Sequence, residues 1–165
     1  MRLSRLLKHL FIPSWVAHRA FPPPTLRKIE QAIQASERSH AGELRFVVEA
    51  SLPLHYVARK RSSRRRAEDL FAALKVWDTE HNTGVLVYVQ LLSRHIEIVA
   101  DRGIAKRVPQ GEWEGVCRAM ERAFKAGEYE RGALEAIEAV TGILAREFPA
   151  RGGRENELPD KPVVL

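Results

Sequence analysis

The chain has 165 residues, 45% of them hydrophobic and 29% charged, which suits one domain with a core and excludes a wholly disordered or collagen-like chain. No run approaches the roughly 18 consecutive apolar residues of a membrane helix, and the single Cys117 excludes an intrachain disulfide and a cysteine-cage metal site. The net charge of +6 is uneven, because residues 1–66 hold 14 Lys and Arg against 4 Asp and Glu, whereas residues 67–165 hold 13 against 17. Such polarity suits a protein that lies against an anionic surface, or a solvated surface that is basic by chance.

Residues 1–24 predict a basic amphipathic helix, from Met1 to about Val16, followed by a stiff Pro-rich spacer. Charges at Arg5 and Lys8 interrupt the apolar core that a secretory signal needs. Two interpretations stay open: an interfacial helix whose aromatic residues enter lipid headgroups, or a helix packed on its own domain. In the first interpretation, the membrane contacts from this segment are Arg2, Arg5, Lys8, Phe11 and Trp15.

Residues 25–149 predict one domain of alternating helices and strands. The expected strands are 43–49, 84–92 and 95–101. Apolar residues that recur at helical spacing predict helices over 25–39, 67–74, 113–124 and 133–144. Gly127 is expected to end the third helix, and Pro149 follows the fourth. Strand, helix and strand in succession favour a right-handed parallel crossover, and the turn Ser93-Arg94 favours an antiparallel hairpin. The predicted fold class is α/β, a small mixed sheet flanked by helices on both faces, with residues 150–165 as a C-terminal tail.

Residues 59–66, Arg-Lys-Arg-Ser-Ser-Arg-Arg-Arg, form a basic cluster that suits contact with lipid phosphates. No aromatic residues are interleaved to stack on bases, so nucleic acid is disfavoured as a partner. The alternative is a solvated loop and helix start. The candidate contacts with an anionic surface here are Arg64, Arg65 and Arg66.

Several catalytic motifs are absent. The sequence contains no G-x-x-x-x-G-K-[ST], H-E-x-x-H, G-x-S-x-G or G-x-G-x-x-G, so we expect neither a P-loop NTPase nor a nucleotide cofactor. Cys117 falls on the apolar face of its predicted helix, which favours a core residue over a nucleophile.

Acidic and amide side chains converge in the predicted topology at one end of the sheet. The first two strands begin there and the third ends there, so hard oxygen donors arrive from separate loops, as Ca²⁺ or Mg²⁺ requires. The alternative is that these are surface charges and a turn residue. The candidate metal ligands are Glu43, Asp78, Asn82 and Asp101, and the other candidate residues at this end are His40, Glu80, Gly84, Arg102 and Gly103.

An ordered set of segments resembles the TPM-domain family, also called the TPM phosphatase domain. The segments are F-A-A-L-K-V-W-D-T-E-H-N-T-G, H-I-E-I-V-A-D-R-G-I, W-E-G-V-C-R-A-M, F-K-A-G-E-Y-E-R-G and N-E-L-P-D-K-P-V. The resemblance implies an α/β/α sandwich, binding of a divalent cation, usually Ca²⁺, in an acidic groove, and the weak acid-phosphatase activity attributed to some members. The positions that match the family are Glu43, Asn82, Gly84, Asp101 and Gly103, although Thr83 stands between Asn82 and Gly84 where relatives show Asn-Gly or a close variant.

Three functions are therefore considered. The first is a cation-binding regulatory or interaction module. Its expected location is the cytoplasm or the inner face of the membrane, because the chain resembles the short bacterial form without signal peptide or membrane helix. For that form the resemblance implies a LemA-like membrane protein or a longer TPM protein as partner. The second is a phosphatase in which a metal held by Glu43, Asp78 and Asp101 activates water while Arg102 or Lys106 holds the phosphate. The third is a scaffold without metal whose acidic end contacts a basic partner.

Overall fold

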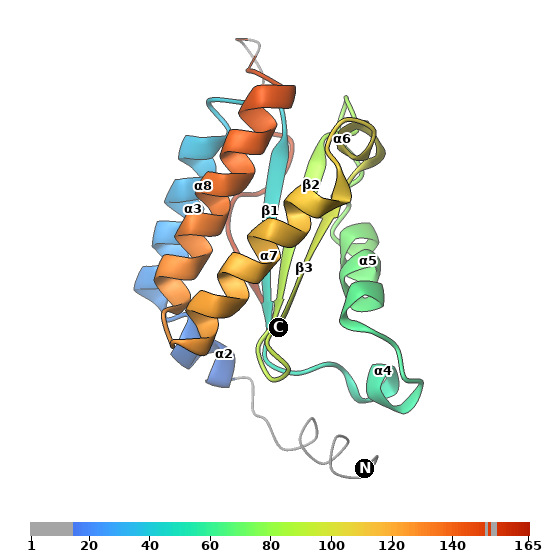
Figure 1. Ribbon diagram of the computed structural model, residues 1–165, viewed down its shortest axis with the longest axis vertical. Helices are drawn as coiled ribbons and strands as arrows, with labels where there is room; N and C mark the ends of the chain where they lie inside the picture. Colours follow the sequence, from blue (N-terminus) through green and yellow to red (C-terminus); the bar gives the residue numbers. More distant parts are fainter. Residues whose placement is uncertain (1–14, 151, 153–154) are drawn as a thin grey trace.

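The computed structural model describes residues 15–150, 152 and 155–165 (Figure 1). Most of the predicted N-terminal helix, with Arg2, Arg5, Lys8 and Phe11, lies outside the described residues. The helices are α2 (Trp15–Ala20), α3 (Pro23–Ser36), α4 (Leu54–Ala58), α5 (Ser63–Ala73), α6 (Arg102–Ala105), α7 (Gln110–Lys125) and α8 (Tyr129–Glu147). The strands are β1 (Glu43–Glu49), β2 (Gly84–Gln90), β3 (His95–Ala100) and β4 (Val163–Val164). None of the described helices has the length and apolar character needed to cross a membrane.

The strands form one mixed sheet in the order β3-β2-β1-β4. β1 and β2 are parallel, in a register that runs from Glu43 opposite Gly84 to Glu49 opposite Gln90. β2 and β3 are antiparallel neighbours. The predicted α/β fold, with its parallel crossover and its hairpin, is therefore confirmed.

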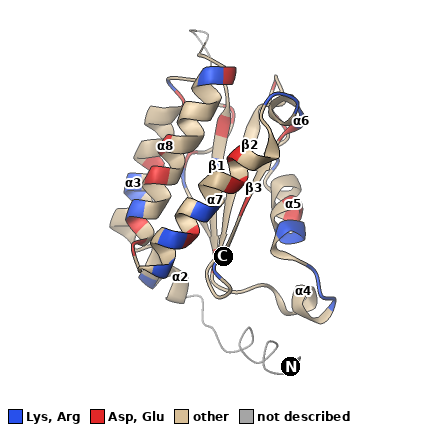
Figure 2. Ribbon diagram, viewed as in Figure 1, with Lys and Arg blue, Asp and Glu red and all other residues tan. Residues whose placement is uncertain are grey.

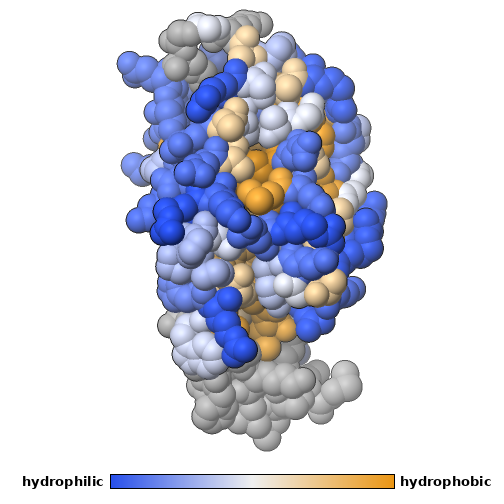
Figure 3. All heavy atoms as spheres, turned by 90° about the vertical axis from the view of Figure 1, so that its left-hand side faces the viewer, coloured by the Kyte–Doolittle hydropathy of each residue, from blue (hydrophilic) through white to orange (hydrophobic). Residues whose placement is uncertain are grey.

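Side chains alternate between the two faces of the sheet, and each face has its own core. Leu44, Phe46 and Val48 point into the larger core, under α2, α3, α7 and α8. Val47 and Leu86 point into the smaller core, under α5. The apolar stripes of the helices account for this layering, since burying a side chain of this size contributes about 1.5–3 kcal/mol. The outer surface on the α3 side is mostly hydrophilic, with a small apolar area near its middle (Figure 3).

The last residues of the chain complete the sheet, although the sequence predicts no element there. β4 is parallel to β1, with Val163 opposite Val47 and Val164 opposite Val48. Leu158 is only 7% exposed and belongs to the smaller core. The segment 155–165 is thus anchored along β1 by packing and by backbone hydrogen bonds.

Candidate functional site

The starts of β1 and β2 and the end of β3 meet at one end of the sheet, as the topology predicts (upper part of Figure 1). Glu43 pairs with Gly84, and the backbone N–H of Asp101 donates to the carbonyl of Gly84 at 2.9 Å. Three of the predicted site residues therefore lie in one row across the three strands.

The loop that precedes β2 packs against Gly84, the middle residue of this row. A Cβ built on Gly84 would lie 1.9 Å from the carbonyl oxygen of Val76, so the backbone of that loop rests directly on this glycine. The Val76 carbonyl occupies the space between Glu43 and Asp101, whose strands are two positions apart. The close approach explains the glycine, because any side chain at this position would clash with the Val76 backbone.

Glu43 contributes its carboxylate to the C-terminal segment. The side chain is buried, and its oxygens accept the backbone N–H groups of Glu157 at 3.3 Å and Leu158 at 3.2 Å. Charge-assisted hydrogen bonds of this kind stabilise an otherwise costly buried carboxylate. Glu43 thus holds residues 157–158 against the start of β1.

Asp101 caps the short helix α6. Its Oδ1 accepts the N–H of Arg102 at 2.6 Å, while Oδ2 is buried without a hydrogen-bond partner among the described residues. Asn82, with φ of 55°, accepts from Arg102 Nε through its Oδ1 at 2.8 Å. A Cβ at Gly103 would meet the Asn82 carbonyl at 2.5 Å. These four residues form a tight polar turn beside the end of β3.

The remaining predicted residues are dispersed or already engaged. Asp78 and Glu80 are exposed in the loop before β2. His40 is buried, with Nε2 2.7 Å from Ser36 Oγ, and Nδ1 lies 3.1 Å from the carbonyl oxygen and 3.2 Å from the backbone nitrogen of Gly42. Both ring nitrogens of His40 are thus occupied within the fold, and the residue orders the chain before β1.

The predicted metal ligands therefore come to one end of the sheet without forming one cluster. Across residues 15–150, 152 and 155–165, no three His, Cys, Asp or Glu side chains are grouped so that they could hold a metal ion as they stand.

A different acidic pocket, of about 530 Å³, opens at the same end between α3, β1 and the C-terminal segment. Its acidic members, which we call the acidic pocket residues, are Glu37, Glu43, Glu155 and Asp160. Other residues on its wall are Gln34, Arg38, His40, Ala150, Gly152 and Asn156. Apart from Glu43 and His40, none of these residues was predicted as part of a site.

Glu37 carries the strongest electrostatic perturbation in this pocket. Burial raises the pKa of Glu37 to about 8, and the negative charges of Glu43 and Asp160 add to the effect. The N–H of Leu44, which donates to Glu37 Oε1 at 2.9 Å, opposes it. A group at this pKa holds its proton at neutral pH because a further negative charge is unfavourable there. One sequence signal was present: an acidic residue at a helix C-terminus, where the helix dipole disfavours negative charge.

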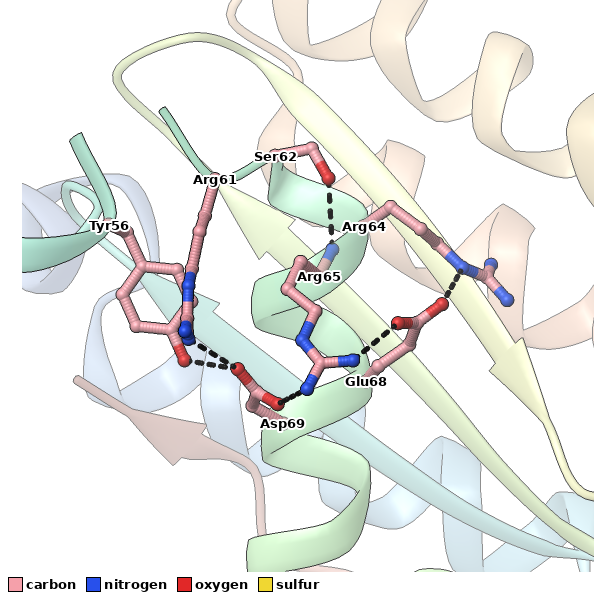
Figure 4. Close-up of polar contacts among 7 residues, drawn as sticks. All are labelled: Tyr56, Arg61, Ser62, Arg64, Arg65, Glu68 and Asp69. Carbon is pink, nitrogen blue, oxygen red and sulfur yellow. Dashed lines mark hydrogen bonds and ion pairs between the residues drawn. The ribbon is translucent and has the colours of Figure 1, made fainter. Parts of the chain in front are cut away.

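The basic cluster lies at the opposite end of the sheet, and its candidate surface contacts Arg64, Arg65 and Arg66 have carboxylate partners within the chain (Figures 2 and 4). Arg64 Nε lies 3.1 Å from Glu68, and Arg65 Nη2 lies 3.2 Å from Asp69. Arg66 binds the buried Glu49 through Nε and Nη2, the closest contact being 2.6 Å. These pairs stabilise α5 and fix it to β1. Trp15, the one described member of the predicted N-terminal membrane contacts, is 56% exposed at the start of α2.

Cys117 is half-buried on α7 and packs against the larger core. Burial raises the pKa of its thiol to about 12, with the charges of Glu97 and Glu121 adding to the effect. The thiolate that a nucleophile requires is therefore scarce at neutral pH, in agreement with the interpretation of Cys117 as a core residue.

Comparisons with known proteins agree with the fold. A family model described as the TPM domain matches residues 18–143. The chain is similar to the BA42 protein of the psychrophilic bacterium Bizionia argentinensis, known from an NMR structure. The identity is 28% and the TM-score 0.75, and the match covers 85% of this chain and 92% of that one. It also resembles the N-terminal domain of a protein from P. gingivalis, at 18% identity and a TM-score of 0.65, over 86% of this chain and 95% of that one. The second likeness concerns the fold alone. A search of curated proteins found no match.

Proposed function

Because the chain belongs to the TPM-domain family, we propose that it is a divalent-cation-binding interaction module whose cation occupies the acidic pocket. The observation that carries this proposal is the convergence of carboxyl groups from three segments distant in sequence. Glu37 follows α3, Glu43 begins β1, and Glu155 and Asp160 belong to the C-terminal segment. The pocket is open to solvent, so an ion can enter without unfolding of the chain.

The chemistry of the pocket suits Mg²⁺ or Ca²⁺. Carboxylate and amide oxygens are the ligands that these hard cations prefer. Mg²⁺ commonly keeps several of its waters and uses only one or two protein carboxylates. A pocket of about 530 Å³ has room for such a hydrated ion, since one water takes about 30 Å³.

Binding of a cation in this pocket would act on the C-terminal segment. Glu43 holds the backbone of residues 157–158, and Asp160 interacts with the side chain of Glu37. A positive ion offsets the negative charges of Glu43 and Asp160 and would therefore stabilise the packing of this segment beside β1. We propose that cation binding orders the surface of the C-terminal segment and that a partner recognises this ordered surface.

We propose that residues 1–20, rather than the basic cluster, make the contact with the membrane. Arg64, Arg65 and Arg66 are engaged in intrachain ion pairs, which reduces the charge that they offer to lipid. The proposed partner is the inner face of the cytoplasmic membrane or a membrane protein, of the LemA-like or longer TPM kind. Co-sedimentation with vesicles of phosphatidylglycerol should fall when residues 1–20 are removed and stay unchanged in Arg65→Gln. Equal sedimentation of the truncated and full chains would contradict this placement.

The cation site is tested by adding Ca²⁺ or Mg²⁺ to the full chain while amide NMR shifts are recorded. We expect localised shifts at residues 37–44 and 155–161, and about tenfold weaker binding in Asp160→Asn. The matched control is Glu138→Gln, an exposed acid on α8 outside the pocket. Shifts confined to residues 78–84 and 101–103 would move the site to the turn around Asp101. No shifts at millimolar metal would exclude cation binding.

A further inference from the structure

A second pocket, of about 550 Å³, lies at the same end of the sheet on the other side of a short backbone bridge. The bridge pairs His40 with Pro149, where Ala41 N–H donates to the Phe148 carbonyl at 2.7 Å and Ala150 N–H donates to the Ser39 carbonyl at 3.2 Å. The second pocket is bounded by α6, the end of α8 and the loops that precede β1 and β2. It shares no lining residue with the acidic pocket.

The inner wall of this pocket is largely apolar. Ala41, Phe148 and Pro149 contribute carbon surface. Thr83 is buried and donates its hydroxyl to the carbonyl of Ala41 at 3.0 Å, so that group is already satisfied within the fold. A bound molecule would therefore meet hydrophobic surface here, which favours an apolar body.

The rim of the pocket is cationic. Arg107 Nη1 donates to the Glu147 carbonyl at 2.9 Å, and its guanidinium lies 4.8 Å from the centre of the Phe148 ring. These two contacts hold the guanidinium in place while leaving most of its five N–H donors for other acceptors. Lys106 is exposed and forms no ion pair with a described residue. The carboxylate of Glu147, the acidic member of the rim, is paired with Arg146 Nε at 2.8 Å.

We propose that this pocket binds a small organic anion, with an acidic head group at Lys106 and Arg107 and an apolar body against Phe148. A cationic rim above a hydrophobic wall is complementary to this combination of charge and surface. The volume lies within the range of about 300–1,000 Å³ that is usual for small-molecule sites. Because the two pockets share no lining residue, this proposal does not rest on the proposed cation site.

The test uses 2-naphthoate as the probe, added to the full chain in the presence of EDTA while amide NMR shifts are recorded. We expect saturable shifts at residues 41, 81–83, 103–107 and 147–149. Lys106→Gln should weaken binding about fivefold, the effect of losing one exposed charge-assisted contact. The matched control Lys125→Gln, an exposed lysine at the far end of α7, should bind as the parent does.

Two further ligands separate the roles of charge and of apolar surface. The uncharged 2-naphthylmethanol and the head group alone, as acetate, should each bind at least tenfold more weakly than 2-naphthoate. Comparable binding of 2-naphthyl phosphate would support the anion class and show that the head group is recognised by charge. Equal affinity for the alcohol, unchanged binding in Lys106→Gln, or no shifts at these residues up to 10 mM probe would each overturn the proposal.

Discussion

Tyr88 donates its phenolic hydroxyl to the carboxylate of Glu49 at 2.6 Å, across the parallel pair of β2 and β1. Glu49 is only 4% exposed, and Arg66 binds both of its oxygens from α5. Burial, together with the adjacent negative charge of Glu49, raises the pKa of Tyr88, so the phenol stays protonated and remains a donor. The three side chains therefore fasten α5 to the sheet through one carboxylate.

Replacing Arg66 with Met should destabilise the fold strongly, because the buried Glu49 would lose its counter-ion. The expected decrease in the free energy of unfolding is about 3–5 kcal/mol, measured by urea denaturation at pH 7. The matched change Arg118→Met breaks an exposed pair with Glu114 and should cost less than about 1 kcal/mol. Equal effects of the two variants would show that the Arg66–Glu49 pair does not hold α5 to β1.

Two glycines with opposite surroundings give a second prediction. A Cβ at Gly84 would lie 1.9 Å from the backbone oxygen of Val76, so Gly84→Ala should cost about 3 kcal/mol or more, or prevent folding. Gly142 lies within α8 and has open space where a Cβ would be placed. Gly142→Ala should therefore raise the free energy of unfolding by about 0.5–1 kcal/mol through helix propensity. Thermal denaturation of both variants tests the prediction, which is refuted if Gly84→Ala melts at the temperature of the parent.

The strands were predictable because their patterns are local. The alternation over 43–49 and the apolar run from residue 84 specify β1 and β2. The antiparallel hairpin was predicted correctly, but its turn was not: the strand expected to reach residue 92 ends at Gln90, and the four residues 91–94 connect it to His95. The partners of Arg64 and Arg65 were also visible, since Glu68 and Asp69 follow them at a spacing of four residues on one helix.

The acidic pocket was not predictable because its members meet through the end of the chain. Glu37 and Asp160 become neighbours only when the C-terminal segment packs along β1, and the two residues of β4 are too few for a strand pattern to be recognised. The close packing at Gly84 depends on a loop backbone, that of Val76. No side-chain pattern in the sequence encodes that contact.

Glu37 should make stability depend on pH in a specific direction. Its pKa rises from 4.5 to about 8 on folding, so the folded state binds more protons than the unfolded state between these values. The contribution of Glu37 to the free energy of unfolding should therefore decline as pH rises from about 4.5 to about 8 and stay level above that. Gln at this position keeps an acceptor for Leu44 N–H but cannot ionise.

Thermal melts of the parent and Glu37→Gln between pH 5 and pH 9, in EDTA, test this dependence. The melting temperature of Glu37→Gln relative to the parent should increase with pH across this range. The exposed control Glu138→Gln should follow the parent at every pH. Parallel curves for the parent and Glu37→Gln would mean that Glu37 ionises in the folded chain much as it does in the unfolded chain.

The C-terminal segment should contribute to global stability because it covers charged groups of β1 as well as apolar ones. Leu158 is buried in the smaller core, and its own N–H satisfies the carboxylate of Glu43. Leu158→Ala should lower the free energy of unfolding by about 2–3 kcal/mol through the lost packing and the cavity left behind. Leu54→Ala, at a side chain that is 44% exposed, should change it by less than about 0.5 kcal/mol. Hydrogen exchange provides a second measurement. If the segment loosens over β1 in Leu158→Ala, residues 43–49 should lose protection. If those residues stay fully protected and the variant is as stable as the parent, residues 155–165 are dispensable for the fold.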